Sequence, residues 1–431
     1  MAKKKQIELT IEEKLQNALV PKEEQPYKIP NNWCWTYVSN VMNIVMGQSP
    51  KGVDTTQNVS DIPLVGGASD MGDLYPRVNK YTKKATKLSK EDDVILSIRA
   101  TLGRPIFSDG VYCLGRGVAG ISSNYLSKEF IRYYYICFES SLYSNATGTT
   151  FLQVTGSVLN KMLIPLPPLN EQQRIVNRIE SLFAKLDRAK ELIENTLAQF
   201  EQNKMAILHK AFTGELTAKW RKKQKIIKKN TWQLVNIKTV SNKIFAGGDV
   251  PKDNMSIEKT DEFKVPIYTN GEKNNGLYGY TNEIKVKDDA ITISARGTIG
   301  YTVIRKAPFY PAIRLITIIP NIEKINIGFL YYVFNFFKVD SAGSSIPQLT
   351  VPMVKDYNFE LPTIEEQQEI VNILDRLLAK YNKIKNLEQQ LEKIELLKKA
   401  ILAKAFRGEL GTNNPDEESA ENLLKEILAE K

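Results

Sequence analysis

A long internal repeat limits the possible folds of this chain more than any other feature. The segment Leu166-Pro-Pro-Leu-Asn-Glu-Gln-Gln-Arg-Ile-Val176 returns as Leu361-Pro-Thr-Ile-Glu-Glu-Gln-Gln-Glu-Ile-Val371. Lys210-Ala-Phe-Thr-Gly-Glu-Leu216 likewise returns as Lys404-Ala-Phe-Arg-Gly-Glu-Leu410. In each copy these two motifs begin and end a long amphipathic stretch, and the two stretches agree in length to within one residue. A chain with two such halves is expected to carry two equivalent binding surfaces.

The repeat extends into the segment before each amphipathic stretch. Asp93-Val-Ile-Leu-Ser-Ile-Arg-Ala-Thr-Leu-Gly103 parallels Asp289-Ala-Ile-Thr-Ile-Ser-Ala-Arg-Gly-Thr-Ile-Gly300. Each of these segments predicts a buried strand followed by a tight turn at its glycine. The repeated unit is therefore a mixed α/β globule followed by a long helix.

Apolar residues recur every three or four positions along both stretches, which is typical of a coiled coil. The first stretch, Asn170 to Phe212, has 43 residues and would be roughly 65 Å long as a helix. Because a globule lies between the two helices, we expect them to pack antiparallel with one globule at each end. The alternative is that each helix folds back on its own globule. The predicted fold class is α+β, with two α/β domains separated by two long antiparallel coiled-coil helices.

These patterns divide the chain into seven segments. We predict an N-terminal arm with a short helix (1–29), a first globular domain (30–165), a first spacer helix (166–216), a basic linker (217–230), a second globular domain (231–360), a second spacer helix (361–410) and an acidic C-terminal tail with a short helix (411–431).

The net charge of +10 is concentrated in one region. Residues 166–230 carry 14 basic and 7 acidic residues, whereas the chain from residue 361 onward has an acidic excess. The densest part is Lys219-Trp-Arg-Lys-Lys-Gln-Lys225, which contains no acidic residue. Such a segment is either a solvated linker or a phosphate-binding surface, and the second alternative predicts strongly salt-dependent binding.

The residue content excludes several classes of enzyme. His209 is the only histidine, and the three cysteines are widely spaced, so metal sites and Ser/His/Asp catalysis are not expected. The chain contains no Gly-x-x-x-x-Gly-Lys-Ser/Thr phosphate loop and no Asn/Asp-Pro-Pro-aromatic motif of amino-methyltransferases. We also find no signal peptide and no apolar run of about 20 residues, which predicts a cytoplasmic protein. These absences favour a binding protein over an enzyme.

The repeated motifs resemble those of one known family. The Leu-Pro-x-x-x-Glu-Gln-x-x-Ile-Val helix beginnings, the Ala-Phe-x-Gly-Glu-Leu helix ends, the segment Ile29-Pro-Asn-Asn-Trp33 and the Arg-x-Thr-x-Gly turns are similar to the specificity subunit of type I restriction-modification systems. The resemblance covers essentially the whole chain. It implies two target recognition domains that each read one half of a bipartite DNA site, with the paired helices setting the unread gap.

The resemblance also implies partners and a division of labour. Two methyltransferase subunits would bring S-adenosylmethionine and methylate adenine, and restriction subunits would cut the DNA. This chain would supply DNA recognition without catalysis or a cofactor of its own. Two other hypotheses remain open: a coiled-coil scaffold whose globular domains bind proteins, and an enzyme with a scattered carboxylate nuclease site.

The internal repeat separates candidate DNA contacts into two groups. Residues shared by both globules cannot distinguish two half-sites, so they are predicted to be structural or to contact phosphates, namely Arg99, Thr101, Gln153, Arg296, Thr298 and Gln348. The basic segment adds the phosphate-contact candidates Lys219, Arg221, Lys222 and Lys223. Base reading is expected where the copies diverge, because Lys and Arg suit guanine edges and Asn suits adenine. The base-reading candidates are Tyr75, Arg77, Asn79, Lys80, Tyr81, Lys83, Lys84, Asn270, Lys273, Asn274, Asn275, Tyr278 and Tyr280.

Partner docking is predicted at the beginnings of the two repeated helices. We expect outward-facing side chains there to contact the methyltransferase subunits, namely Glu171, Gln172, Glu366 and Gln367. Alternatively, the two glutamates only stabilise the positive ends of the helix dipoles.

Overall fold

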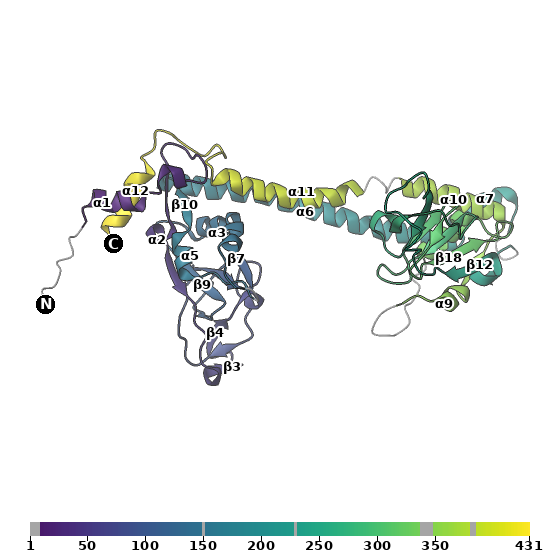
Figure 1. The fold of residues 1–431 in the computed structure, drawn as a ribbon, viewed down its shortest axis with the longest axis horizontal. Helices are drawn as coiled ribbons and strands as arrows, with labels where there is room; N and C mark the ends of the chain where they lie inside the picture. Colours follow the sequence, from purple (N-terminus) through teal and green to yellow (C-terminus); the bar gives the residue numbers. More distant parts are fainter. Residues whose placement is uncertain (1–8, 149–150, 228–230, 337–347, 380–384) are drawn as a thin grey trace. The chain divides into compact units, whose positions relative to one another are not determined.

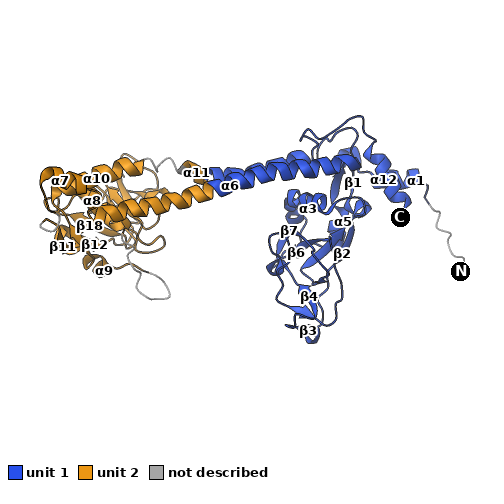
Figure 2. Cartoon of the chain, turned by 180° about the vertical axis from the view of Figure 1, so that it is seen from behind, with its two compact units in different colours: residues 1–192, 389–431 blue, residues 193–388 orange. Residues whose placement is uncertain are grey.

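The computed structural model describes residues 9–148, 151–227, 231–336, 348–379 and 385–431 (Figure 1). The chain forms two compact units, which Figure 2 shows in different colours. Unit 1 comprises residues 1–192 and 389–431, and unit 2 comprises residues 193–388. Both boundaries between the units fall inside long helices, so each unit contains one globular domain and parts of two helices.

Unit 1 is built around a four-stranded antiparallel sheet with the order β2-β9-β6-β7. Its central strand β6 is an apolar run in which five of the six residues are buried, as expected for a strand covered on both faces. A second small sheet has the order β3-β5-β4-β8, and β1 pairs with β10. The strands of unit 1 are β1 (Cys34–Tyr37), β2 (Asn43–Met46), β3 (Thr55–Thr56), β4 (Ile62–Val65), β5 (Tyr81–Thr82), β6 (Val94–Arg99), β7 (Thr101–Phe107), β8 (Cys113–Leu114), β9 (Val118–Ser122) and β10 (Leu163–Leu166).

The helices of unit 1 complete its core. Helix α3 begins where the Ser127 hydroxyl accepts a hydrogen bond from the Phe130 amide, and it buries an aromatic face against the sheet. Helix α1 begins with a capping box between Thr10 and Glu13, and it packs against α12 near the C-terminus. The helices contained wholly in unit 1 are α1 (Ile11–Ala18), α2 (Val38–Val41), α3 (Lys128–Cys137), α4 (Glu139–Ser144), α5 (Gly156–Lys161) and α12 (Ala420–Ala429).

Unit 2 repeats this plan. Its main sheet is again four-stranded and antiparallel, with the order β12-β18-β15-β16, so β15 occupies the position that β6 occupies in unit 1. A three-stranded sheet has the order β14-β13-β17, and β11 pairs with β19. The elements contained in unit 2 are β11 (Gln233–Asn236), β12 (Ser241–Ala246), β13 (Val265–Tyr268), β14 (Leu277–Thr281), β15 (Ala290–Ile293), β16 (Thr302–Arg305), β17 (Tyr310–Pro311), β18 (Ile316–Pro320), β19 (Asn358–Leu361), α7 (Ala218–Gln224), α8 (Ile327–Phe336), α9 (Val351–Lys355) and α10 (Ile364–Ala379).

Two helices cross the boundaries between the units. Helix α6 (Leu169–Phe212) is continuous over 44 residues, and helix α11 is Lys385–Ala405. Within unit 1 they run antiparallel, because Asp187 pairs with Lys398 and Lys190 pairs with Glu395. The apolar positions at the start of α6 share a core with the end of α11.

The sequence-based fold prediction is confirmed for the mixed helix and sheet content, the two repeated domains and the long helix α6. The second spacer helix predicted over 361–410 contains two described helices, α10 and α11, and residues 380–384 between them lie outside the described residues. The predicted basic linker 217–230 includes the short helix α7, while residues 228–230 also lie outside the described part. The separation of the two domains along the helices stays a prediction. No helix in the described ranges is long and apolar enough to cross a membrane.

Candidate nucleic-acid interface

A hairpin turn occurs in both units and is anchored in the same way in each. In unit 1 the Val154 amide donates a 2.9 Å hydrogen bond to the Ile98 carbonyl beside the β6–β7 turn. In unit 2 the equivalent Leu349 amide donates a 3.0 Å hydrogen bond to the Ala295 carbonyl beside the β15–β16 turn. Gly300, with a φ of +80°, lies in the β15–β16 turn as predicted. Gly103, with a φ of +84°, lies inside β7 opposite Ser97, and the turn of this hairpin is at Ala100, so the predicted turn position of Gly103 is wrong.

The residues shared by the two globules lie together at these turns. Arg99 and Gln153 are joined by a backbone bridge. In unit 2 the Arg296 guanidinium donates hydrogen bonds of 2.9 and 3.2 Å to the Gln348 side-chain oxygen. Thr101 and Thr298 are exposed. These contacts support the structural interpretation of the shared residues, while the exposed hydroxyl groups are available for phosphate contact.

In unit 2 the divergent loop lies directly against the shared turn. This recognition loop, residues 269–276, connects β13 to β14. The Asn270 side-chain oxygen accepts a 2.7 Å hydrogen bond from the Ala295 amide, and the Gly271 amide donates a 3.0 Å bond to the Ser294 hydroxyl. The fold therefore brings the shared and the divergent candidates of this unit to one place, although they are separated in sequence.

The divergent loop of unit 1 is held by the same hairpin. The Arg104 guanidinium, on β7, donates to the carbonyls of Ala68 and Met71 at 3.4 and 3.3 Å. The Phe107 amide donates a 2.7 Å hydrogen bond to the Leu74 carbonyl. Both units thus place a variable loop on a constant β-hairpin.

Most of the predicted base-reading side chains are accessible. In unit 1 all of them are exposed except Tyr81, which is half-buried. Arg77 also makes an exposed ion pair of 3.3 Å with Asp73. In unit 2 Tyr280 and Asn270 are half-buried, and the remaining candidates are exposed, namely Lys273, Asn274, Asn275 and Tyr278.

Asn270 differs from the other candidates because both the oxygen and the nitrogen of its side-chain amide are already engaged. Its oxygen accepts from the Ala295 amide, and its nitrogen donates to the Ile313 carbonyl. An asparagine that reads adenine needs a free donor and a free acceptor. Asn270 therefore holds the recognition loop in place and does not present a free amide edge to a base.

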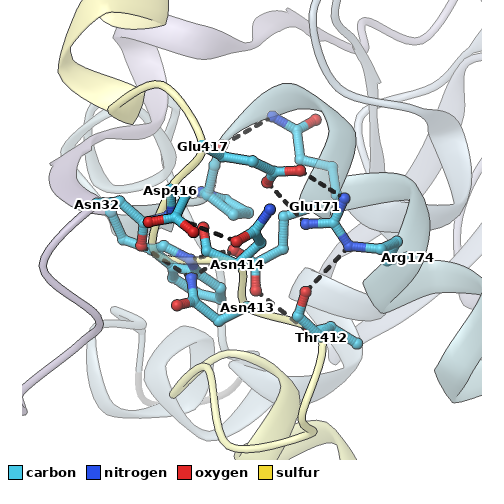
Figure 3. Close-up of polar contacts among 11 residues, drawn as sticks. Asn32, Glu171, Arg174, Thr412, Asn413, Asn414, Asp416 and Glu417 are labelled. Atoms are coloured by element: carbon cyan, nitrogen blue, oxygen red, sulfur yellow. Dashed lines mark hydrogen bonds and ion pairs between the residues drawn. The ribbon is translucent and has the colours of Figure 1, made fainter.

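The expectation that Glu171 and Gln172 face outward is wrong. The Glu171 carboxylate is completely buried and accepts hydrogen bonds from Trp33 at 2.7 Å and from Asn413 at 2.8 Å (Figure 3). Thr412 donates a third hydrogen bond to it at 3.2 Å. The Gln172 side chain is also buried and donates to the Pro167 carbonyl. These residues close the junction between the helix start and the C-terminal tail.

The corresponding residues of unit 2 are buried in the same way, so their predicted outward orientation is also wrong. The Glu366 carboxylate accepts from Trp232 at 2.9 Å and from Thr217 at 2.6 Å, and it forms an ion pair with Arg221. The Gln367 side chain donates to the Pro362 carbonyl at 2.8 Å. A helical glutamate is bonded to a tryptophan and a threonine in both units.

The same contacts correct the assignment of Arg221. It is a predicted phosphate contact, yet its guanidinium is buried between Glu366, Thr217 and the Gly214 carbonyl. The phosphate-contact candidates Lys219, Lys222 and Lys223 are exposed on the same helix, α7. Burial of Arg221 fixes α7 to the start of α10 and leaves these lysines on the surface.

Several residues that position the interface were not predicted from sequence. Arg104, Tyr301 and Arg305 each donate a hydrogen bond to a divergent loop. Burial lowers the pKa of the Arg305 guanidinium, which is 5% exposed. The repeated tryptophans Trp33 and Trp232 precede each globule, and their recurrence was a signal that could have identified the buried glutamate junctions. Within the described residues, no group of three or more His, Cys, Asp or Glu side chains could hold a metal ion.

Comparison with protein families identifies a model that matches most of the chain. The model described as type I restriction modification DNA specificity domain matches twice, over residues 30–199 and 229–396. The two matches correspond to the two halves of the internal repeat.

Individual relatives agree with this match. A putative type I specificity subunit from Mycoplasma pneumoniae is 30% identical over 226 residues, which are 52% of this chain and 58% of the relative. A putative MjaX specificity subunit from Methanocaldococcus jannaschii is 30% identical over 46% of this chain and 47% of its own length. Against these relatives the matched region thus spans only about half of their length. The StySPI specificity subunit from Salmonella potsdam is 26% identical over 94% of this chain and 96% of its own length.

Solved structures share the fold. One chain from a type I R-M system has a TM-score of 0.70 at 20% identity, covering 89% of this chain and 100% of that chain. The HsdS subunit from Thermoanaerobacter tengcongensis has a TM-score of 0.51 at 20% identity, covering 90% and 99%.

Proposed function

Because the chain belongs to the type I restriction modification DNA specificity family, we propose that it recognises a bipartite duplex DNA site with one domain per half-site. In this role it directs partner subunits to the DNA and performs no catalysis itself. The rest of the complex supplies the chemistry.

One observation carries this proposal: each unit places a divergent, polar loop on a constant β-hairpin. The two hairpins present exposed Lys, Asn, Arg and Tyr side chains from loops of different sequence. Two domains of the same fold could therefore recognise two different base sequences. The shared arginine and threonine residues beside each loop suit sequence-independent contacts to phosphate, which orient a protein on the duplex. Exposed lysines on α7 add positive charge to unit 2.

The proposed partners are two methyltransferase subunits and restriction subunits of the same complex. The repeated Glu171 and Glu366 junctions support two docking sites, because each gives a helix start the same buried contacts. The surfaces around them differ in charge, since basic α7 in unit 2 takes the place of the acidic segment 413–420 in unit 1. S-adenosylmethionine would bind to the methyltransferase subunits, and the complex would act in the cytoplasm.

The proposal is tested by binding the full chain to a pool of fluorescent duplexes with random sequence. At rising salt concentration we expect the logarithm of the binding constant to fall linearly with the logarithm of salt, with a slope of about −0.9 per phosphate contacted. Repeated rounds of selection should enrich two separate sequence blocks at a fixed spacing.

Two outcomes would contradict this proposal. Absence of duplex binding at low salt would favour the scaffold hypothesis, in which the globular domains bind proteins. Enrichment of a single continuous block would contradict the assignment of one half-site to each domain. A cleavage assay of the isolated chain with magnesium addresses the nuclease hypothesis, and we expect no cleavage.

A further inference from the structure

The recognition loop of unit 2 rests on a buried arginine that the sequence analysis did not identify. Arg305 lies on β16, and its Nη2 donates a 2.6 Å hydrogen bond to the Asn275 carbonyl. We propose that Arg305 is a positioning residue that fixes the shape of this loop and thereby sets base discrimination at one half-site. This inference rests on the proposed function and concerns the residues that control it.

The environment of Arg305 is unusual for a charged residue. It is 5% exposed, and it takes part in no ion pair found among the described residues. The guanidinium lies 3.9 Å from the centre of the Tyr268 ring, and its Nε donates a 3.0 Å hydrogen bond to the Thr292 hydroxyl. Burying a charge without a counter-charge is costly, so the contacts of this guanidinium have to compensate for lost hydration. One of those contacts is the recognition loop.

The loop has a conformation that needs support. Asn274, Asn275 and Gly276 are three consecutive residues with positive φ, at 51°, 50° and 72°. Asparagine tolerates this conformation better than most residues, but each such residue still costs free energy. The Arg305 bond reaches the middle residue of the three, and the Tyr301 hydroxyl donates a 2.8 Å bond to the side-chain oxygen of the same residue. Asn275 is thus held from both its backbone and its side chain.

This support bears directly on base recognition. Lys273, Asn274 and Asn275 are exposed, and all three are predicted to read bases. Because the Asn275 side-chain oxygen already accepts from Tyr301, Lys273 and Asn274 are the side chains that the loop presents to bases. Hydrogen bonds to base edges depend on donor and acceptor positions, so a shift of the loop would weaken discrimination without removing any reading side chain. Phosphate contacts made elsewhere would persist, and overall affinity would change less than specificity.

Unit 1 offers an internal comparison. Arg104 tethers its divergent loop from the equivalent strand β7, with longer hydrogen bonds of 3.3 and 3.4 Å and an exposed side chain. Loss of this tether should affect only the half-site of unit 1, and by less than the loss of Arg305 affects its own half-site.

The experiment selects bound sequences from a pool of random duplexes with the full chain and its variants. Arg305→Lys keeps the positive charge but loses the planar set of N–H donors of the guanidinium. Tyr301→Phe removes only the hydroxyl that donates to the Asn275 side chain. We expect each to reduce the preference for the correct bases at one and the same half-site, by about tenfold for Arg305→Lys. The other half-site should be unchanged. Lys306→Met is the matched control, because Lys306 is the adjacent residue and is exposed, with an ion pair to Asp289 outside the loop.

The outcomes separate this inference from the proposed function. If the unmodified chain selects two blocks and both loop-tether variants keep full preference at both, the role of Arg305 is refuted. Equal loss at both half-sites, or the same loss in Lys306→Met, refutes it as well, since either result would indicate a general charge or stability effect. Thermal melting identifies a variant that does not fold. If Arg305→Lys does not fold, the base preference of Tyr301→Phe tests whether support of the loop sets discrimination. If the unmodified chain selects no sequence, the proposed function fails and this inference fails with it.

Discussion

Glu171 and Glu366 show how a charged residue at a helix start can serve the core. From sequence, a glutamate in the first turn is expected either to face a partner or to stabilise the helix dipole. In the fold, each carboxylate is fully buried and accepts hydrogen bonds from a tryptophan and a threonine. A buried carboxylate is tolerated only when its oxygens are satisfied, which both junctions achieve.

The ion pair of Arg221 with Glu366 predicts a large effect on stability. Replacing Arg221 with Met leaves the Glu366 carboxylate buried without its counter-charge, which should cost about 3 kcal/mol of unfolding free energy. Urea unfolding followed by tryptophan fluorescence measures this, because Trp232 contacts the same carboxylate. The control is Lys222→Met on the same helix, which should change stability by less than about 0.5 kcal/mol because Lys222 is exposed. Equal effects of the two variants would show that the buried pair has no special role.

The ion pair of Glu417 with Arg174 predicts a pH dependence of the C-terminal tail. The hydrogen bond from Arg174 lowers the pKa of Glu417 below its ordinary value of 4.5. A carboxylate with a depressed pKa in the folded state stabilises that state above its unfolded pKa, and this contribution is lost as the pH falls through the folded pKa. Hydrogen exchange of residues 411–431 should therefore accelerate beyond the intrinsic change as the pH falls below the ordinary pKa of 4.5 and through the lower pKa that Glu417 has in the folded chain.

A matched pair of variants tests this assignment. Glu417→Gln should show weaker protection at pH 6 and a smaller loss of protection in acid, because the pair is already absent. Glu418→Gln changes an exposed neighbour and should behave like the unmodified chain. An acid response that survives in Glu417→Gln would assign it to other groups.

At the scale of elements, the regularly spaced apolar residues of α6 predict a partner helix but do not determine the register between the two helices. Apolar residues at intervals of three and four along α6 require cover, and in unit 1 part of that cover comes from α11. The register is visible in charged residues, because Asp187 lies beside Lys398 and Lys190 lies beside Glu395. Many long helices could cover the same apolar residues of α6, and only the folded structure shows how α11 aligns with α6.

This register can be measured with a double-mutant cycle. Alanine substitutions at Asp187 and Lys398 should give a coupling energy of about 0.5 kcal/mol, since the pair is partly exposed and screened by water. The control cycle combines Asp187→Ala with Lys399→Ala, the exposed neighbour on α11, and should give a coupling near zero. If the control cycle gives the larger coupling, the α6–α11 register is different from the one described.

At the scale of the whole molecule, duplication provides two domains with similar main sheets, which differ in their second sheets and loops. The main sheets have the same order of equivalent strands, and the hairpin turns are anchored by equivalent backbone bonds. Divergence is concentrated in the segments that lie on those hairpins. Under the proposed function, this arrangement would allow one domain to change its target without altering the other.

Exchange of one loop segment tests that independence. Replacing residues 66–90 with the corresponding segment of another family member should change one half-site and leave the second half-site and the gap unchanged. Mapping of methylated adenines in cells that carry the exchanged chain and its partner subunits reads out the complete site. If both half-sites change, or if neither does, recognition is not divided between the domains as we propose.

The repeat, the helix stripes and the strand patterns were sufficient to predict two α/β domains with a long helix, because they depend on local periodicity. Gly300 at the β15–β16 turn could be assigned for the same reason, since a tight turn is a local property. Burial of Glu171, Glu366 and Arg221 was not predicted, because each has a partner more than 100 residues away along the chain, and the recurrence of Trp33 and Trp232 was the one local signal of these junctions. The role of Arg305 was not predicted either, although its partners Asn275 and Thr292 are only 30 and 13 residues away, because its contact with the recognition loop depends on how the strands of unit 2 pack. Helix and strand periodicity depends on residues that are close in sequence, so it can be predicted from sequence alone. Desolvation and long-range hydrogen bonds form only when folding brings distant residues together.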